Sequence, residues 1–78
     1  MEILKIRDDY DLSDLENLGF KVYTYEIYKY YVYPDVENSG ISISIYDRYV
    51  NVDSHIKTEH LTILYDLIQE GIIEKVEI

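Results

Sequence analysis

The chain has 78 residues, no cysteine and a formal charge of −9, from sixteen acidic against seven basic side chains. This length predicts one domain, residues 1–78, and favours a shallow groove or binding face over a deep catalytic cavity. The missing cysteines exclude disulfides and thiolate metal sites, and the acidic balance argues against direct contact with nucleic acid or an anionic membrane. Without a signal-peptide pattern or a bilayer-length apolar run, the chain is expected in the cytoplasm.

The N-terminal segment predicts a short strand over residues 2–6 and then a short amphipathic helix. Ser13 and Glu16 have the spacing of a capping box, which places the N-cap at Ser13. Gly19 supplies the left-handed residue that ends this helix. One helix face would carry three leucines, Leu12, Leu15 and Leu18.

Residues 21–33 contain the strongest strand signal, because aromatic and β-branched side chains fit a pleated, half-buried surface. The alternation is broken, since Tyr23 and Tyr25 share one parity whereas Tyr28 and Tyr30 share the other. A β-bulge near residues 27–28 would bring both pairs onto one face. Two short strands with a tight turn near Glu26 would do the same. We favour the bulge.

Residues 34–40 form a turn by composition, and the strand that follows alternates strictly. Its isoleucines, Ile41, Ile43 and Ile45, are expected to face the core while its serines face water. Residues 46–49 predict a tight connection into another strand over 49–53. A single long strand is the alternative, because no glycine fixes the turn type.

A second helix is predicted from a cap at Thr58 to about Glu70. Its expected core-facing stripe, at positions i, i+3, i+4 and i+7, consists of Leu61, Leu64, Tyr65 and Ile68. Gly71 would end the helix and release residues 73–78 as a terminal strand.

These elements predict an α+β domain of order β-α-β-β-β-α-β, with a small, mainly antiparallel sheet and two helices on one face. The predicted core combines the helix stripe with residues of the middle strands: Leu61, Leu64, Tyr65, Ile68, Ile43, Ile45 and Val22.

No motif predicts an enzyme, a cofactor or a metal. Asp9-x-Asp11-x-Ser13 begins like a calcium loop, but the sixth position is Asp14 and the twelfth is Phe20, where that loop needs glycine and glutamate. His55 and His60 are five residues apart, which is unsuited to a shared helical zinc site. Neither a nucleophile elbow nor a glycine-rich phosphate loop is present.

Eight of the ten tyrosines fall between Tyr23 and Tyr49, and a core this small cannot bury them all, so three or more should be exposed on the sheet. They could be cross-strand pairs that support the sheet. They could equally form a protein-binding face, because tyrosine is enriched at interface hot spots. RNA-binding sheets combine aromatic with basic residues, and acids flank this segment instead.

The hypothesis is therefore a non-enzymatic protein-binding module. Its most specific form is an inhibitor that occupies a basic, nucleic-acid-binding enzyme surface with ordered carboxylates. The alternative is a small accessory protein that homodimerises through its tyrosine-rich sheet face or a sheet edge. The candidate binding residues are Asp8, Asp9, Asp11, Asp14, Glu16, Tyr28, Tyr30, Asp35, Glu37 and Asp47.

In composition the chain resembles the small, acidic, Tyr/Ile/Lys/Glu-rich proteins encoded by phages and mobile elements of AT-rich bacteria. The resemblance covers no motif. It implies an inhibitor of host defence enzymes, of the anti-CRISPR or anti-restriction kind, some of which mimic DNA.

Overall fold

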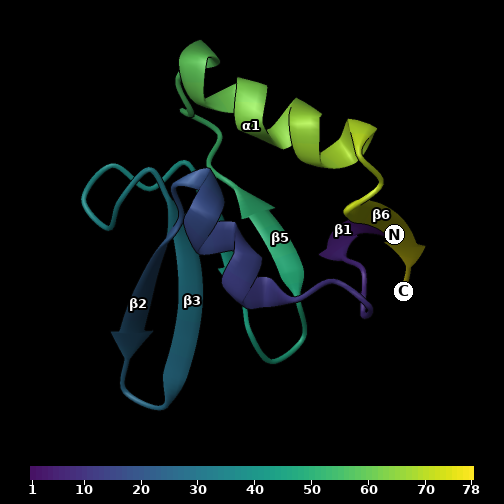
Figure 1. The fold of residues 1–78 in the computed structure, drawn as a ribbon, viewed down its shortest axis with the longest axis horizontal. Helices are drawn as coiled ribbons and strands as arrows, with labels where there is room; N and C mark the ends of the chain where they lie inside the picture. Colours follow the sequence, from purple (N-terminus) through teal and green to yellow (C-terminus); the bar gives the residue numbers. More distant parts are fainter.

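A computed structural model describes residues 1–78 as a six-stranded antiparallel sheet with two helices (Figure 1). The elements in chain order are β1 (Glu2–Ile6), η1 (Leu12–Leu18), β2 (Lys21–Tyr25), β3 (Tyr28–Tyr33), β4 (Ile41–Ser44), β5 (Tyr49–Val52), α1 (Thr58–Gln69) and β6 (Ile73–Glu77). The predicted α+β class is confirmed. The predicted order was wrong in two respects, because an additional strand is present and the first helix is a 3-10 helix.

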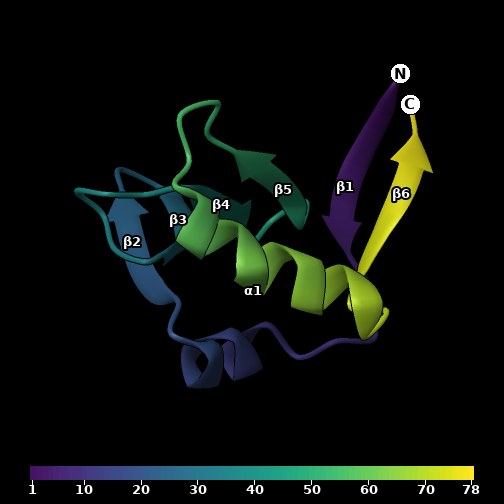
Figure 2. The same ribbon diagram turned by 90° about the horizontal axis from the view of Figure 1, so that it is seen from above.

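The strands lie in the order β2-β3-β4-β5-β1-β6 across the sheet. Strands β2 to β5 form a meander, and β1 inserts between β5 and β6, so β2 and β6 are the two edges. Between β5 and β1 the pairing is short, joining Leu4 to Val50 and Lys5 to Tyr49. Figure 2 shows that β1 and β6 turn away from the other strands at this junction.

The extra strand arises within residues 21–33, where the favoured β-bulge was wrong and the tight turn is observed. Strands β2 and β3 form a hairpin in which Tyr25 lies opposite Tyr28 and Tyr23 opposite Tyr30. Two residues make the turn, and Glu26 adopts a positive φ of 54° there. The right-handed twist of paired strands favours this kind of two-residue connection.

The first helix begins differently from the prediction. Asp11 is the N-cap in place of Ser13, and its carboxylate accepts hydrogen bonds from both the backbone N–H and the hydroxyl of Ser13. The Ser13 hydroxyl is therefore used as a donor. The leucine spacing of three residues suits a 3-10 helix, in which residues i and i+3 align. Gly19 ends the helix at φ 100°, as predicted.

Helix α1 has almost the predicted bounds, but it packs through a different face. Leu64 and Leu67 are buried, whereas Tyr65 and Ile68 are 62% and 44% exposed, so their assignment to the core was wrong. The segment is apolar on both sides of Leu64, and the helical spacing fits either stripe. Thr58 is the first helical residue, and no side chain caps it.

The core lies between the sheet and the two helices, which cover the same face (Figures 1 and 2). It contains Ile6, Leu15, Phe20, Ile41, Ile43, Leu64, Leu67 and Ile73. Ile41 and Ile43 are fully buried, as the alternation predicts, whereas Ile45 lies beyond the end of β4 and outside the core, so its assignment to the core was wrong. Val22 lies on edge strand β2 and is 48% exposed, so it was wrongly assigned to the core. We call this side of the sheet the covered face.

Candidate protein-binding face

The opposite side of the sheet carries no helix, and we call it the open face. Residues that pair across antiparallel strands share a face, so Tyr23, Tyr30 and Ser44 lie together there. The hairpin register adds Tyr25 and Tyr28, and the neighbouring strand β5 adds Tyr49. Both tyrosine parities of residues 21–33 therefore meet on this face.

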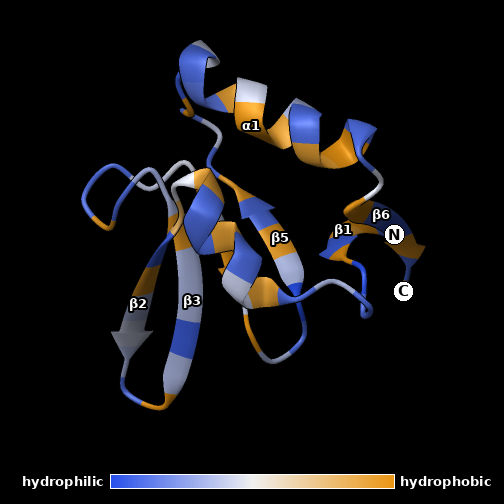
Figure 3. Ribbon diagram, in the orientation of Figure 1, coloured by the Kyte–Doolittle hydropathy of each residue, from blue (hydrophilic) through white to orange (hydrophobic).

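We define the tyrosine face as the five strand tyrosines together with Tyr46 of the turn between β4 and β5. Its members are Tyr23, Tyr25, Tyr28, Tyr30, Tyr46 and Tyr49. Four of them, Tyr25, Tyr28, Tyr46 and Tyr49, are exposed, which confirms the expectation of several solvent-facing tyrosines. Figure 3 colours β3 mostly pale, because tyrosine has intermediate hydropathy and does not register as an apolar patch.

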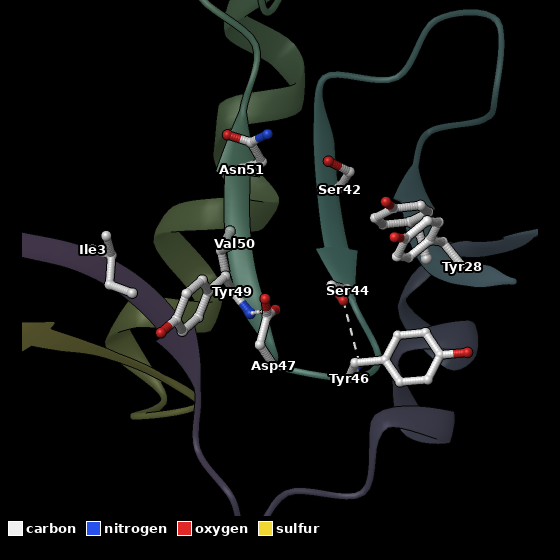
Figure 4. A pocket seen from close by; sticks show the side chains of 10 residues that line it. Ile3, Tyr28, Ser42, Ser44, Tyr46, Asp47, Tyr49, Val50 and Asn51 are labelled. Carbon is white, nitrogen blue, oxygen red and sulfur yellow. Dashed lines mark hydrogen bonds between the residues drawn. The ribbon is translucent and has the colours of Figure 1, made fainter. Parts of the chain in front are cut away.

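An open concavity of about 450 Å³ lies within the tyrosine face. Figure 4 shows the rings of Tyr28 and Tyr46 on one side of it and the ring of Tyr49, near Ile3, on the other. Ser42, Ser44 and Asn51 supply polar groups from the strands between them. The result is a shallow surface with aromatic walls and a polar floor.

Four hydrogen bonds fix the loop at one end of this concavity. The hydroxyl of Tyr46 donates to the backbone carbonyl of Ile27, which joins the β4–β5 turn to the β2–β3 turn. The carboxylate of Asp47 accepts the backbone N–H of Tyr49 at 2.9 Å. Arg48, at a positive φ of 65°, lies between them. Its guanidinium donates to the carbonyls of Arg7 and Tyr10, which anchors the turn to the loop after β1.

The acidic candidates do not join the tyrosines, with the exception of Asp47. Asp8 and Asp9 lie in the turn after β1 and form exposed ion pairs with Lys5 and Arg7. Asp14 and Glu16 are exposed on η1, on the helix side of the sheet.

The remaining acidic candidates, Asp35 and Glu37, lie in the loop between β3 and β4. The carboxylate of Asp35 accepts the backbone N–H of Asn38 at 2.8 Å, and this bond lowers the pKa of Asp35 below its ordinary value. Glu37 is exposed. The candidates therefore occupy three places: the η1 side, this loop and the open face.

The negative charges of Asp14, Glu70 and Asp11 act on Tyr10, which lies just before η1. Partial burial and then these three carboxylates raise the pKa of the Tyr10 phenol above its ordinary value. The pKa of Asp11, by contrast, is lowered by the hydrogen bonds that its carboxylate accepts from Ser13. Glu70, at the end of α1, was missed by the sequence analysis, because only the fold brings it to the same surface hollow as Tyr10.

The histidines belong to separate pairs, and His55 is exposed whereas the His60 ring is largely covered and packs edge-on against Tyr33. The Nδ1 of His55 lies 3.7 Å from the Asp53 carboxylate, and the Nε2 of His60 lies 3.8 Å from that of Glu59. No group of three or more His, Asp or Glu side chains converges in a metal-binding arrangement. No helix is long and apolar enough to cross a bilayer.

Comparison of the chain with protein-family models, with curated proteins and with solved structures found no match.

Proposed function

We propose that the protein is a non-enzymatic protein-binding module that binds a partner on its tyrosine face. One observation carries this proposal: a sheet face without helices presents six tyrosines, four of which line an open concavity. Tyrosine offers large contact area, a hydrogen-bonding hydroxyl and little side-chain entropy to lose, which makes it a frequent interface anchor. Ser42, Ser44 and Asn51 would complement the partner's polar groups.

The composition of the concavity supports binding rather than catalysis. No histidine, lysine or cysteine lines it, and its one carboxylate, Asp47, accepts the backbone N–H of Tyr49 instead of a serine hydroxyl. The groups with a shifted pKa, Tyr10, Asp11, Tyr31 and Asp35, are not among its lining residues. Functional sites for proton transfer usually contain such groups.

Charge supports a protein rather than a nucleic acid as the partner. A net charge of −9 opposes the phosphate contacts on which nucleic-acid binding depends. Glu26 and Asp47 lie at the turns that border the tyrosine face, and they suit a partner whose apolar anchor is flanked by Arg or Lys. The cysteine-free composition fits a reducing location such as the cytoplasm.

A second candidate function is favoured by the acidic residues on the η1 side. Partial burial and then the charges of Asp14, Glu70 and Asp11 together raise the pKa of Tyr10, and Asp8 and Asp9 lie in the preceding turn. In this candidate, these carboxylates imitate the phosphates of DNA and the protein inhibits an enzyme with a basic, nucleic-acid-binding surface. The compositional resemblance to phage-encoded proteins supports the same candidate.

Three variants separate the two candidates. Tyr28→Ser with Tyr30→Ser removes two anchors from the tyrosine face. Tyr65→Ser is the matched control, because Tyr65 is 62% exposed on α1 and lies outside that face. Asp8→Lys with Asp9→Lys and Asp14→Lys reverses charge on the η1 side, and Asp11 stays because it caps η1.

Each immobilised protein is exposed to host lysate, and bound proteins are identified and titrated in increasing salt. If the partner binds on the tyrosine face, its affinity for the Tyr28/Tyr30 variant should be lower by more than about 30-fold. This is the effect of removing a hot spot worth about 2 kcal/mol. The Tyr65 and acidic variants should retain the partner. If instead only the acidic variant fails to bind the partner, and the affinity of the natural protein falls steeply with salt, binding on the tyrosine face is excluded and the second candidate is favoured.

A further inference from the structure

The outer edge of β2 has unpaired backbone groups at two positions. In a hairpin with a two-residue turn, the residues flanking the turn form a hydrogen-bonded pair, here Tyr25 and Tyr28. Alternation then directs the N–H and C=O groups of Val22 and Thr24 away from β3. The same alternation explains two hydrogen bonds on the other side of β3. The Lys29 carbonyl accepts the backbone N–H of Ile45, and the Tyr33 carbonyl accepts that of Gly40.

The two edges of the sheet differ in how they are protected. Proteins usually block a free edge with charges, proline or a bulge. Strand β6 carries Glu74 and Glu77, and it lies beside Glu2 of β1. Strand β2 has the sequence Lys-Val-Tyr-Thr-Tyr, with neither an acid nor a proline, and all of its residues except Tyr23 are exposed. Strand β6 carries three charged side chains, with Lys75 between the two glutamates, whereas β2 carries only Lys21, so β2 is the less protected edge.

We infer that a second copy of this chain pairs with β2, antiparallel, and continues the sheet across a two-fold axis. The unpaired groups determine the register. When Val22 of each copy lies opposite Thr24 of the other, every outward N–H and C=O of β2 finds a partner. A shift of two residues along the strand would leave one of these residues without its partner. Tyr23 then lies on the axis, opposite Tyr23 of the second copy.

The charges of β2 agree with this register. Lys21, at the start of the strand, is placed opposite Tyr25 of the second copy and next to Glu26 in its turn. A cation thus meets an aromatic ring and a carboxylate on both sides of the axis. The β2–β3 hairpin carries Lys21 and Lys29 against Glu26, one net positive charge in a chain of −9, so it is the least acidic place for two copies to meet.

The dimer has a consequence for the surface described above. A two-fold axis perpendicular to the sheet keeps the open faces of both copies on the same side. The two tyrosine faces become one continuous surface with Tyr23 at its centre. The dimer is a property of this chain alone, so it does not require the partner protein of the proposed function.

Single cysteines test the register directly, because the natural chain has none. A residue pair such as Tyr23 with its copy, between two hydrogen-bonded pairs, has Cα atoms about 4.5 Å apart, within disulfide range. Tyr23→Cys should therefore oxidise to a covalent dimer. Tyr25→Cys is the matched control on the same face, since its copies would be offset by about 13 Å along the strand.

We expect Tyr23→Cys to cross-link at least tenfold faster than Tyr25→Cys at equal protein concentration. Equal rates, or faster reaction of Tyr25→Cys, would overturn the inferred pairing.

Sedimentation equilibrium tests the edge itself. The natural protein and Thr24→Val should show twice the chain mass of 9.3 kDa at high concentration. Thr24→Pro removes an outward N–H without touching the β2–β3 bonds, and it should remain monomeric with an unchanged circular dichroism spectrum. A natural protein that stays monomeric at every concentration, or a Thr24→Pro variant that still dimerises, would contradict the inference. If Thr24→Pro unfolds, the cysteine comparison decides.

Discussion

The two faces of the sheet use the same strands for different purposes, and β4 shows the contrast within four residues. Ile41 and Ile43 point into the core and are completely buried, whereas Ser42 and Ser44 point to the open face and line its concavity. Burial of apolar area is the main source of stability in the first case. In the second, the side chains remain available for contact. Substitutions on the open face should therefore leave the domain folded.

The largest test of this contrast compares neighbours on β4. Ile43→Ala should lower the free energy of unfolding by about 2–5 kcal/mol, because it removes a fully buried side chain and leaves a cavity. Ser42→Ala should change it by less than about 0.5 kcal/mol, as expected for a surface position. Urea denaturation of both variants measures the difference. Similar losses in the two would show that the open face is also part of the folding core.

A second prediction concerns Gly40, the buried residue that precedes β4. A Cβ at this position would lie 2.7 Å from Cγ1 of Ile56, so Gly40→Ala should cost about 1–3 kcal/mol through overpacking. Adding Ile56→Ala should leave the double variant more stable than the sum of the single losses predicts.

Gly71→Ala provides the control for Gly40, because no atom lies within 4 Å of a Cβ there and φ is 75°. Its loss of about 1–2 kcal/mol would come from the left-handed backbone alone, so Ile56→Ala should not alter it. Rescue of both glycine variants by Ile56→Ala would exclude the steric explanation.

The smallest expected effect concerns Asp11, on the helix side. Hydrogen bonds from Ser13 lower the pKa of the folded carboxyl below its ordinary value of 3.8. Folding therefore favours the charged form, and the resulting stability is present above pH 3.8 and lost as pH falls through the folded pKa. Asp11→Ala should melt at a lower temperature than the natural protein near neutral pH, and the difference should shrink in acid.

Asp11→Asn is the control for this titration, because the amide oxygen can still accept at the N-cap without ionising. Thermal melts between pH 2 and 7 would give the comparison. A difference between Asp11→Ala and the natural protein that stays constant over this range would show that charge at Asp11 does not stabilise η1.

Local patterns predicted most elements of the fold, and the errors have a common origin. The strict alternation of Ile41, Ser42 and Ile43 identified a strand with one buried face. The stripe of α1 could not be identified in the same way, since the helix is apolar on more than one side and only docking selects Leu67 over Ile68. For residues 21–33, a bulge and a turn produce the same parity change. Glu26 at positive φ gives no sequence signal comparable to glycine.

The candidate site was only partly predictable for a related reason. Tyr28 and Tyr30 were predicted because tyrosine is abundant in residues 21–33. Tyr46 and Tyr49 join them only through the pairing of β4 with β3 and β5. The acidic residues were predicted to bind a partner because they are dense along the chain. Density along the chain does not determine on which side of a sheet a loop will lie, so the acids and the tyrosines were combined in one predicted site.

The position of β1 between β5 and β6 has a consequence for how the chain folds in time. Strands β2 to β5 join neighbours through short turns, so these pairings close small loops and can form early. Leu4, by contrast, lies opposite both Val50 and Lys75, and these contacts close most of the chain. Because long loops cost more entropy to close, the β1–β6 end should be the slow step of folding, after the strands that carry the tyrosine face have formed.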